Sequence, residues 1–158
     1  MNRLCFRLAS IDDSERLCSL MKNSCRTNFN FPEQAIAGYA QLFETNNFTS
    51  FLERERAAVW VAVFDEMVCG FLLALPPEGG VSTVLWLLVD QSFQARGIGS
   101  MLFDQCVDFY KKHGVHKIKL TAPSEDAVAF YKRIGFQVEG FHPHHWWGKD
   151  FWSLGYNL

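Results

Sequence analysis

Three apolar runs in the middle of the chain are separated by turn-forming residues. Residues 58–64 and 67–75 lie on either side of an acidic turn, and this pattern predicts an antiparallel hairpin. A loop rich in proline and glycine follows at 76–80. The next run, residues 81–89, is apolar on both faces in its second half, which predicts a central strand of a sheet.

Helical spacing of apolar residues precedes this region. Residues 12–15 have capping-box spacing, and Leu17, Leu20 and Met21 follow at helical intervals, so a helix is expected there. Pro32 predicts the first turn of a second helix. Residues 48–56 are expected to form a short third helix. Residues 2–8 alternate weakly between apolar and polar and predict an edge strand.

The second half of the chain alternates between helical and strand patterns. The expected elements are a helix from 98 to 113, a strand at 115–121, a helix at 123–134, and strands at 136–141 and 150–157. A loop rich in His and Trp separates the last two strands. The strand–helix–strand order implies parallel pairing, whereas the hairpin implies antiparallel pairing. We therefore expect an α/β (α+β) fold with a mixed sheet and helices on both faces.

Length and charge narrow the class of protein. A chain of 158 residues without repeats or linkers is expected to form one domain over residues 1–158. Lys and Arg number 15 against 17 Asp and Glu, so the basic excess typical of nucleic-acid binders is missing. No apolar stretch approaches the ~20 residues that a membrane span needs, and the start of the chain lacks a signal-peptide pattern. We expect a cytoplasmic protein with neither a nucleic-acid nor a membrane partner.

Cysteine usage supports the same compartment. The five cysteines are odd in number, irregularly spaced and without a C-x-x-C pair. This pattern predicts free thiols, not a disulfide framework or a cysteine-rich zinc site.

The residues after the third apolar run carry the most specific chemical signal. Gly97 and Gly99 stand where a strand gives way to a helix. A helix start offers unpaired N–H groups and a positive dipole end, which suit an anion such as a phosphate. A P-loop would need Gly-Lys-Ser/Thr, and a dinucleotide fingerprint would need a third Gly or Ala; neither is present here.

The turn reads Q-x-x-G-x-G and resembles the pyrophosphate-binding motif of the GNAT N-acetyltransferases. The matching positions are Val89, Gln94, Gly97 and Gly99, whereas Gln91, Phe93 and Ala95 stand where the family commonly has Pro, Tyr and Gly. A second family motif, N-x-x-A-x-x-F-Y-x-x-x-G-F, matches at Ala127, Phe130, Tyr131, Gly135 and Phe136, with Ser124 in place of Asn. Together with the hairpin and the closing strand, the resemblance covers nearly the whole chain. It implies a GNAT-like acyl-CoA N-acyltransferase fold with a mostly antiparallel sheet of six or seven strands.

The resemblance also implies acetyl-CoA, or another acyl-CoA, as cosubstrate. The backbone amides expected to hold its pyrophosphate are those of Gln94, Ala95, Arg96, Gly97, Ile98, Gly99 and Ser100. The backbone of Leu87, Leu88 and Val89 is expected to pair with the pantetheine arm. Arg96 is open to two interpretations, a phosphate partner or a solvated surface residue. Ser124 is likewise open to two, a hydrogen bond to pantetheine or a helix N-cap.

The family mechanism implies direct attack of an amine on the thioester. The oxyanion would be held by the backbone N–H of Leu88 or Val89. Tyr131 matches the family tyrosine that protonates the leaving thiolate, with aromatic packing as its alternative role. Residues 81–89 contain no Asp or Glu, so the general base stays open. The candidates are Asp90, Glu66, Glu139, His142, His144 and His145.

Two further features of the last loop have alternative interpretations. Its histidines suit zinc or copper, but no further ligand has recognisable spacing, so we expect no metal. Trp146 and Trp147 are expected either to wall an acceptor pocket or to fill space under the loop.

The resulting hypothesis is an N-acetyltransferase that moves an acetyl group from acetyl-CoA to a primary amine of a small molecule or peptide in a ternary complex. Because the central strand lacks a carboxylate, a catalytically silent acyl-CoA-binding or sensing module is one alternative. A protein acetyltransferase acting on N-termini or lysines is another. The aromatic content of 15% would also suit a homodimer interface.

Overall fold

Seven strands form one open sheet in the computed structural model, which describes residues 3–158. The strands are β1 (Leu4–Leu8), β2 (Ala58–Phe64), β3 (Met67–Ala74), β4 (Val81–Val89), β5 (Lys117–Ala122), β6 (Gln137–His142) and β7 (Phe151–Asn157), in the order β1-β2-β3-β4-β5-β7-β6. Within the described residues only β4 and β5 pair in parallel. The mixed, mostly antiparallel α/β sheet expected from the sequence is therefore confirmed.

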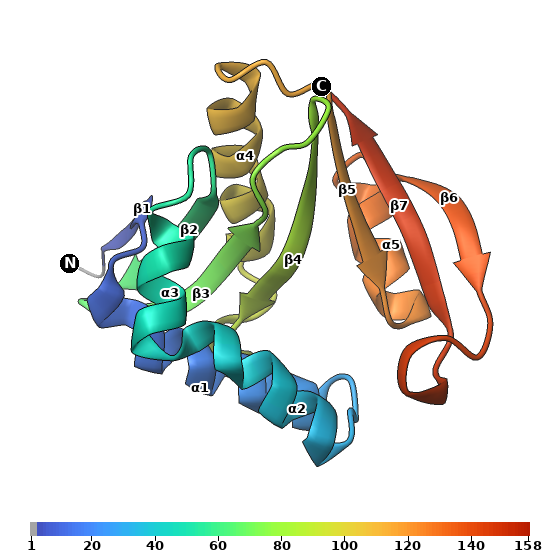
Figure 1. Ribbon diagram of the computed structural model, residues 1–158, viewed down its shortest axis with the longest axis horizontal. Coiled ribbons are helices and arrows are strands. Elements are labelled where there is room, and N and C mark those ends of the chain that lie inside the picture. Colours follow the sequence, from blue (N-terminus) through green and yellow to red (C-terminus); the bar gives the residue numbers. More distant parts are fainter. Residues whose placement is uncertain (1–2) are drawn as a thin grey trace.

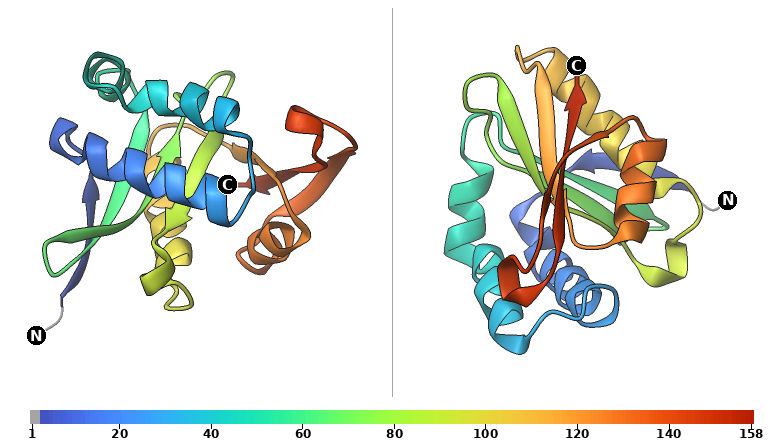
Figure 2. Two further views of the ribbon diagram at one scale, coloured as in Figure 1. Left: turned by 90° about the horizontal axis from the view of Figure 1, so that it is seen from below. Right: turned by 90° about the vertical axis from the view of Figure 1, so that its right-hand side faces the viewer.

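Helices cover both faces of this sheet. The α-helices are α1 (Ser14–Thr27), α2 (Glu33–Ala40), α3 (Thr45–Leu52), α4 (Ile98–Lys111) and α5 (Glu125–Arg133). Short 3-10 helices are η1 (Ile11–Asp13), η2 (Gln41–Phe43), η3 (Gln91–Phe93) and η4 (Trp146–Gly148). The first three α-helices lie on one face, and α4 and α5 lie on the other (Figure 1 and Figure 2).

Two hydrophobic cores result, one on each face. In β2, Val59, Val61 and Val63 join the core under α1–α3, whereas Ala58 and Ala62 join the core under α4 and α5. Successive side chains of a strand point to opposite faces, so a strand covered on both sides needs apolar residues at every position. This is why residues 58–64 form a continuous apolar run and not an alternating one.

Most element boundaries match the sequence prediction to within one or two residues, and the third helix is the main correction. It spans Thr45–Leu52 and not 48–56, because the charged segment that follows Leu52 forms turns. The fifth strand starts at Lys117, two residues later than expected. The predicted edge strand at 2–8 is observed as Leu4–Leu8, and Asn2 lies outside the described residues.

The parallel pair β4–β5 opens like a V (Figure 1). Ladder pairing joins Val81, Ser82 and Thr83 to residues 117–119 and then stops. On its other side, β4 changes register against β3 between the pairs Ala74↔Val84 and Leu73↔Trp86, so Leu85 is an extra residue. A bulge of this kind bends the strand and increases its twist. The C-terminal half of β4 therefore diverges from β5 and keeps one unpaired backbone edge.

Candidate active site

Two cavities flank the free edge of β4. The first, here called the α4–α5 cavity, measures about 960 Å³ and is enclosed by the end of β4, the start of α4, α5 and the end of α1. The second, here called the aromatic cavity, measures about 700 Å³ and lies toward α2, β6 and β7. Five residues line both cavities: Phe29, Leu87, Leu88, Pro123 and Tyr131. The two cavities therefore meet at the diverging half of β4.

The turn between β4 and α4 presents a concave set of backbone amides to the α4–α5 cavity. Ala95 and Gly97 both adopt the left-handed conformation, with φ of +61° and +76°. The first α-helical hydrogen bond inside α4 is donated by the Met101 N–H to the Gly97 carbonyl, at 3.0 Å. The N–H groups at the very start of α4 consequently have no partner within the helix. Left-handed turn residues followed by a helix start form an anion-binding nest.

At Gly99, the second glycine of the turn, α4 comes close to a side chain of α5. A Cβ added at Gly99 would lie 3.2 Å from Cζ of Phe130 on α5. A side chain at this position would therefore press on the Phe130 ring, which would have to shift by a few tenths of an ångström. Glycine is therefore favoured at position 97 by its left-handed backbone conformation and at position 99 by the lack of space for a side chain.

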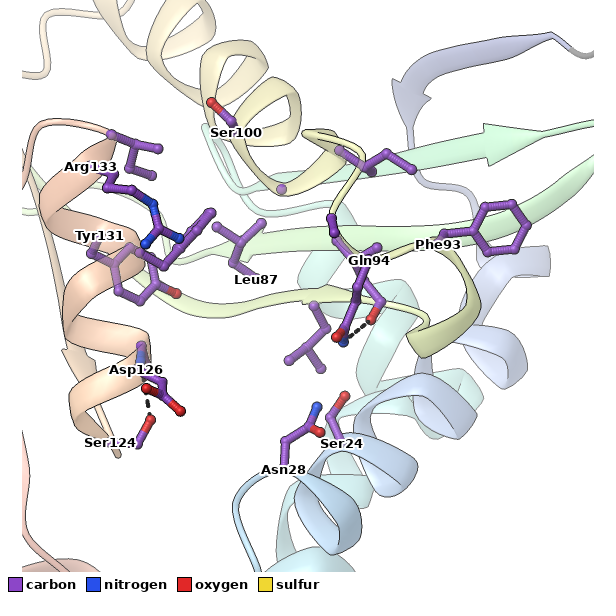
Figure 3. A pocket seen from close by; sticks show the side chains of 18 of the residues that line it. Ser24, Asn28, Leu87, Phe93, Gln94, Ser100, Ser124, Asp126, Tyr131 and Arg133 are labelled. Atoms are coloured by element: carbon purple, nitrogen blue, oxygen red, sulfur yellow. Dashed lines mark hydrogen bonds between the residues drawn. The ribbon is translucent and has the colours of Figure 1, made fainter.

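Most of the residues predicted to bind the coenzyme are brought together around this cavity. Its lining includes Leu87, Leu88, Val89, Gln94, Ala95, Gly97, Ile98, Gly99, Ser100, Ser124 and Tyr131. Arg96 is not part of that lining, and its guanidinium lies over the ring of Phe93, 5.2 Å from the centroid. The basic residue that does line the cavity is Arg133, which projects toward it from α5 (Figure 3).

Sequence reasoning missed Arg133 and the contribution of α1. Ser24, Thr27 and Asn28 at the end of α1 also line the α4–α5 cavity, and Figure 3 shows Ser24 and Asn28 below the turn. No local pattern marks these residues, since only the folding of α1 across the face of β4 brings them there. Arg133 follows Tyr131 by two residues, and its position on the cavity depends on how α5 sits against the sheet.

Along the end of β4, the N–H and C=O groups of successive residues point alternately toward β3 and toward the opening between β4 and β5. The Asp90 N–H donates to the Cys69 carbonyl of β3 at 2.8 Å, and the Leu88 carbonyl also faces β3, since it would lie 2.9 Å from a Cβ added at Gly70. The Val89 carbonyl, in contrast, accepts a hydrogen bond from the Gln94 side chain at 3.1 Å. Because N–H and C=O groups of successive residues alternate sides, the peptide groups of Leu87 and Val89 point into the opening.

Tyr131 stands where the two cavities meet. Its ring packs against Phe130 and Phe136, with centroid distances of 5.2 and 5.3 Å. The phenol points toward the opening beside Leu87 in Figure 3. Burial raises the pKa of Tyr131 above its ordinary value, because the phenolate would lose solvation. The hydroxyl is therefore protonated at neutral pH and able to donate a proton.

Ser124 caps α5. Its Oγ accepts a hydrogen bond from the Ala127 N–H at 3.1 Å, so the N-cap interpretation made from the sequence is confirmed. The same side chain lines the α4–α5 cavity. A hydroxyl that accepts one hydrogen bond still has its own proton to donate, so capping leaves Ser124 available to a ligand.

Among the candidate general bases, only Glu139 lines a cavity. Glu139 is one of the residues that line the aromatic cavity, and its carboxylate accepts a hydrogen bond from Lys117 Nζ at 2.6 Å. Glu66 lies in the turn between β2 and β3 and lines neither cavity. His142, His144 and His145 also lie outside both linings.

Asp90 is engaged in holding the end of β4. Its carboxylate accepts from Arg16 Nη2 at 2.7 Å and from the Ser92 N–H at 2.9 Å. Burial works to raise the pKa of Asp90, but the hydrogen bonds from Ser92 and Arg16 outweigh it, so the pKa lies below its ordinary value. Asp90 also lines neither cavity, so it is not placed to take a proton from a bound acceptor.

The described residues contain no cluster of three or more His, Cys, Asp or Glu side chains that could hold a metal ion. All five cysteines are free thiols. In residues 3–158 no helix has both the length and the apolar character required to cross a bilayer.

Comparison with known proteins gives one consistent result. A sequence profile described as "Acetyltransferase (GNAT) family" matches residues 18–136. An uncharacterized N-acetyltransferase of Methanocaldococcus jannaschii is 36% identical over 59 residues, which are 36% of this chain and 26% of the relative, so the match spans about a quarter of the relative's length.

Solved structures show the same fold. The PaiA N-acetyltransferase of Thermoplasma acidophilum, solved in complex with coenzyme A, superposes with a TM-score of 0.83 at 20% identity, covering 99% of both chains. The ribosomal-protein-S18-alanine N-acetyltransferase of Escherichia coli gives a TM-score of 0.75 at 17% identity, covering 99% of this chain and 94% of that one.

Proposed function

The chain belongs to the acetyltransferase (GNAT) family, and from that membership we propose that it transfers an acetyl group from acetyl-CoA to a primary amine of a small molecule. The observation that carries the proposal is the meeting of two cavities at the free edge of β4, beside the Tyr131 phenol. One cavity has a backbone anion nest and the other has none. This division suits a coenzyme on one side and an acceptor on the other.

The coenzyme would occupy the α4–α5 cavity. Its pyrophosphate would bind the amides from Gln94 to Ser100, where the nest and the dipole of α4 both favour negative charge. Arg133 would add a positive charge at the same cavity. The pantetheine arm would pair with the Leu87 N–H and C=O, in the way an added strand pairs with a sheet edge, because the Val89 carbonyl already accepts from the Gln94 side chain. Ser124 would donate its hydroxyl proton to the same arm.

The reaction would then proceed without a covalent enzyme intermediate. The amine nitrogen attacks the carbonyl carbon of the thioester, and the Val89 N–H stabilises the oxyanion because it points into the opening. The C–S bond breaks as the C–N bond is kept. Tyr131 donates its hydroxyl proton to the leaving thiolate and is reprotonated by the proton that the nitrogen gives up.

The acceptor arrives as an ammonium ion and must lose a proton before it can attack, since a free amine has a pKa near ~10.4. We propose Glu139 as the residue that receives this proton and passes it to solvent, because it is the candidate carboxylate that reaches the aromatic cavity. Its ion pair with Lys117 would hold the carboxylate in place.

Two measurements test the proposal. Acetyl-CoA at about 100 times its Kd should stabilise the fold by about 2.7 kcal/mol, which a thermal melting curve detects as a rise of several degrees. Free-thiol release from acetyl-CoA should then depend on an added primary amine. Unchanged melting at saturating acetyl-CoA would rule out the coenzyme site.

A silent acyl-CoA-binding module is the second candidate, and it is favoured by the lack of a carboxylate on β4. It predicts the same rise in melting temperature but no amine-dependent release of thiol from any class of amine. The two candidates therefore differ only in the second measurement.

A further inference from the structure

The aromatic cavity has an unusual lining for a site that receives a polar amine. Eight of its twenty lining residues are aromatic, and only Lys119 and Glu139 carry a charge. The aromatic residues are Phe29, Phe31, Tyr39, Trp86, Tyr131, Trp146, Trp147 and Phe151. Trp146 and Trp147 remain 50% and 43% exposed, which packing of the protein core does not explain.

These rings are already packed against one another, so the walls are preformed. Tyr39 meets Trp86 edge-on at 5.3 Å, Phe31 stacks on Phe151 at 6.3 Å, and Trp146 meets Phe151 edge-on at 5.2 Å. A ligand entering this cavity would find flat apolar faces and would not need to order them. Aromatic rings are the groups that gain most from such surroundings, through stacking and edge-to-face contacts.

A hydrogen bond joins two walls of the cavity. Trp147 Nε1 donates to the Tyr39 hydroxyl at 3.0 Å and links the loop between β6 and β7 to α2. The two segments are 108 residues apart in the sequence and lie side by side in Figure 2. An extended polypeptide lying between α2 and this loop would have to break the bond. The arrangement therefore favours a compact acceptor over the N-terminus or lysine of a folded protein.

The charges in the lining also restrict the acceptor. A polyamine or an aminoglycoside brings several positive charges, each of which needs a partner when it is removed from water. The cavity offers the single carboxylate of Glu139, already paired with Lys117, together with the positive charge of Lys119. The Glu139 carboxylate has two oxygens and can accept from one ammonium group besides Lys117, whereas any further ammonium group would have no anionic partner in this lining.

We infer that the acceptor is a small arylalkyl amine, that is, one primary amine joined by a short aliphatic arm to an aromatic ring. This inference rests on the proposed function and specifies its substrate class. The ring lies among Tyr39, Trp86 and Trp147, and the amine reaches the junction with the α4–α5 cavity at Tyr131. The products are the N-acetyl arylalkyl amine and coenzyme A, with one proton released to solvent from the ammonium through Glu139.

The test compares acceptors of one reaction in a free-thiol assay. The probes are 2-phenylethylamine, spermidine, kanamycin and a short peptide with a free N-terminal alanine. The expected result is a kcat/KM for 2-phenylethylamine about tenfold or more above that for each of the others, which is within the range that an apolar pocket can discriminate. Acetylation of spermidine, kanamycin or the peptide at an equal or higher kcat/KM would overturn the inference and leave the proposed function intact.

Variants locate the specificity in the cavity. Trp147→Ala should raise the KM for 2-phenylethylamine about fivefold to tenfold, since an aromatic contact and its buried area are lost, while acetyl-CoA binding measured by calorimetry stays unchanged. Tyr39→Phe keeps the ring and removes the bond to Trp147, so it should raise kcat/KM for the peptide. The matched control is Phe141→Ala, an aromatic residue that is 51% exposed and lines neither cavity. If the control shifts the KM as much as Trp147→Ala does, the assignment of the cavity is wrong.

A binding readout separates the inference from catalysis. Three of the five tryptophans line the aromatic cavity, so 2-phenylethylamine should change the tryptophan fluorescence of the complex with coenzyme A. Saturable binding without thiol release from any amine would overturn the proposed function while keeping the ligand class of the cavity. No fluorescence change and no release with any amine would overturn both.

Discussion

A single phenol stands between the two cavities, and its removal has a defined expected effect. Tyr131→Phe keeps the aromatic contacts with Phe130 and Phe136 and removes only the proton donor. We expect kcat to fall about a hundredfold, the lower end of what general acid catalysis contributes, with acetyl-CoA affinity unchanged. Steady-state kinetics and calorimetry measure the two quantities. Burial raises the pKa of this hydroxyl, so the phenol stays protonated from about pH 6 to about pH 9. The ratio of kcat between the parent and Tyr131→Phe should therefore be constant over that range. Equal losses of kcat and of coenzyme affinity would identify Tyr131 as a packing residue.

Two arginines near the same cavity differ in where their charge lies. Arg133 lines the α4–α5 cavity, whereas Arg96 packs over Phe93 and does not. Arg133→Gln should raise the KM for acetyl-CoA about threefold to fivefold, as expected for a solvent-exposed ion pair with a phosphate. The increase should shrink at high salt, where such pairs are screened. Arg96→Gln is the matched control, and an equal or larger effect from it would contradict the placement of these side chains.

Within the turn before α4, Gly97 combines a left-handed backbone with a place in the anion-binding nest, and Gly79 serves as a control that has only the first property. The φ angle is +76° at Gly97 and +59° at Gly79, which lies in the loop between β3 and β4. A Cβ added at either glycine would have no heavy atom within 4 Å. Alanine at either position should destabilise the fold by about 1–2 kcal/mol through backbone strain. Only Gly97→Ala should also weaken acetyl-CoA binding, because it disturbs the amides of the nest. Urea unfolding and calorimetry give the two readings, and equal coenzyme affinity for both variants would argue against the nest.

The elements themselves were largely predictable, but the site was predictable only where it is local in sequence. Apolar runs gave β2 and β4 with their observed bounds, and the glycine turn located the start of α4. The pairing of β4 with β5 ends after Thr83. No short stretch of sequence indicates this, because it depends on a change of register between β4 and β3. Only part of the lining of the aromatic cavity could likewise be predicted from the sequence. Trp146 and Trp147 stood out in their loop, but Tyr39 and Trp86 reach them through tertiary packing.

For the whole molecule, the opening of the sheet connects the fold to the chemistry. Each face of the sheet has its own hydrophobic core, so α1–α3 and α4–α5 are held independently on opposite sides of β4. Where β4 and β5 part, the two faces become continuous, and side chains from both cores line the gap. A coenzyme bound from one face and an acceptor bound from the other can then react across one strand. The rigidity of this arrangement depends on how firmly α1 is fixed to the sheet.

Two ion pairs fix α1, and they make the stability of the whole fold sensitive to acid. Arg7 of β1 pairs with Asp13 at 2.8 Å, just before α1 begins, and Arg16 of α1 pairs with Asp90 at 2.7 Å, just after β4. For both carboxyl groups burial works to raise the pKa, but hydrogen bonds and the arginine charges outweigh it, so both pKa values are lowered on folding. A lowered pKa in the folded state means that the stabilisation is complete well above the unfolded value of about 3.9 and is lost as pH falls below it.

Unfolding by urea at a series of pH values tests this dependence. The double variant Asp13→Asn, Asp90→Asn should be less stable than the parent chain at pH 7, and the difference should shrink steadily between about pH 5 and pH 2 as the parent loses its charged carboxylates. The double variant Asp104→Asn, Asp108→Asn removes two carboxylates from the exposed surface of α4. It therefore controls for the change in net charge and should leave the pH profile close to that of the parent. A difference between parent and double variant that is as large at pH 2 as at pH 7 would mean that these aspartates act through packing and not through their charge. Asp90 also follows the strand at whose free edge we propose that the coenzyme binds, so acetyl-CoA affinity should decline over the same acidic range, before the fold itself is lost.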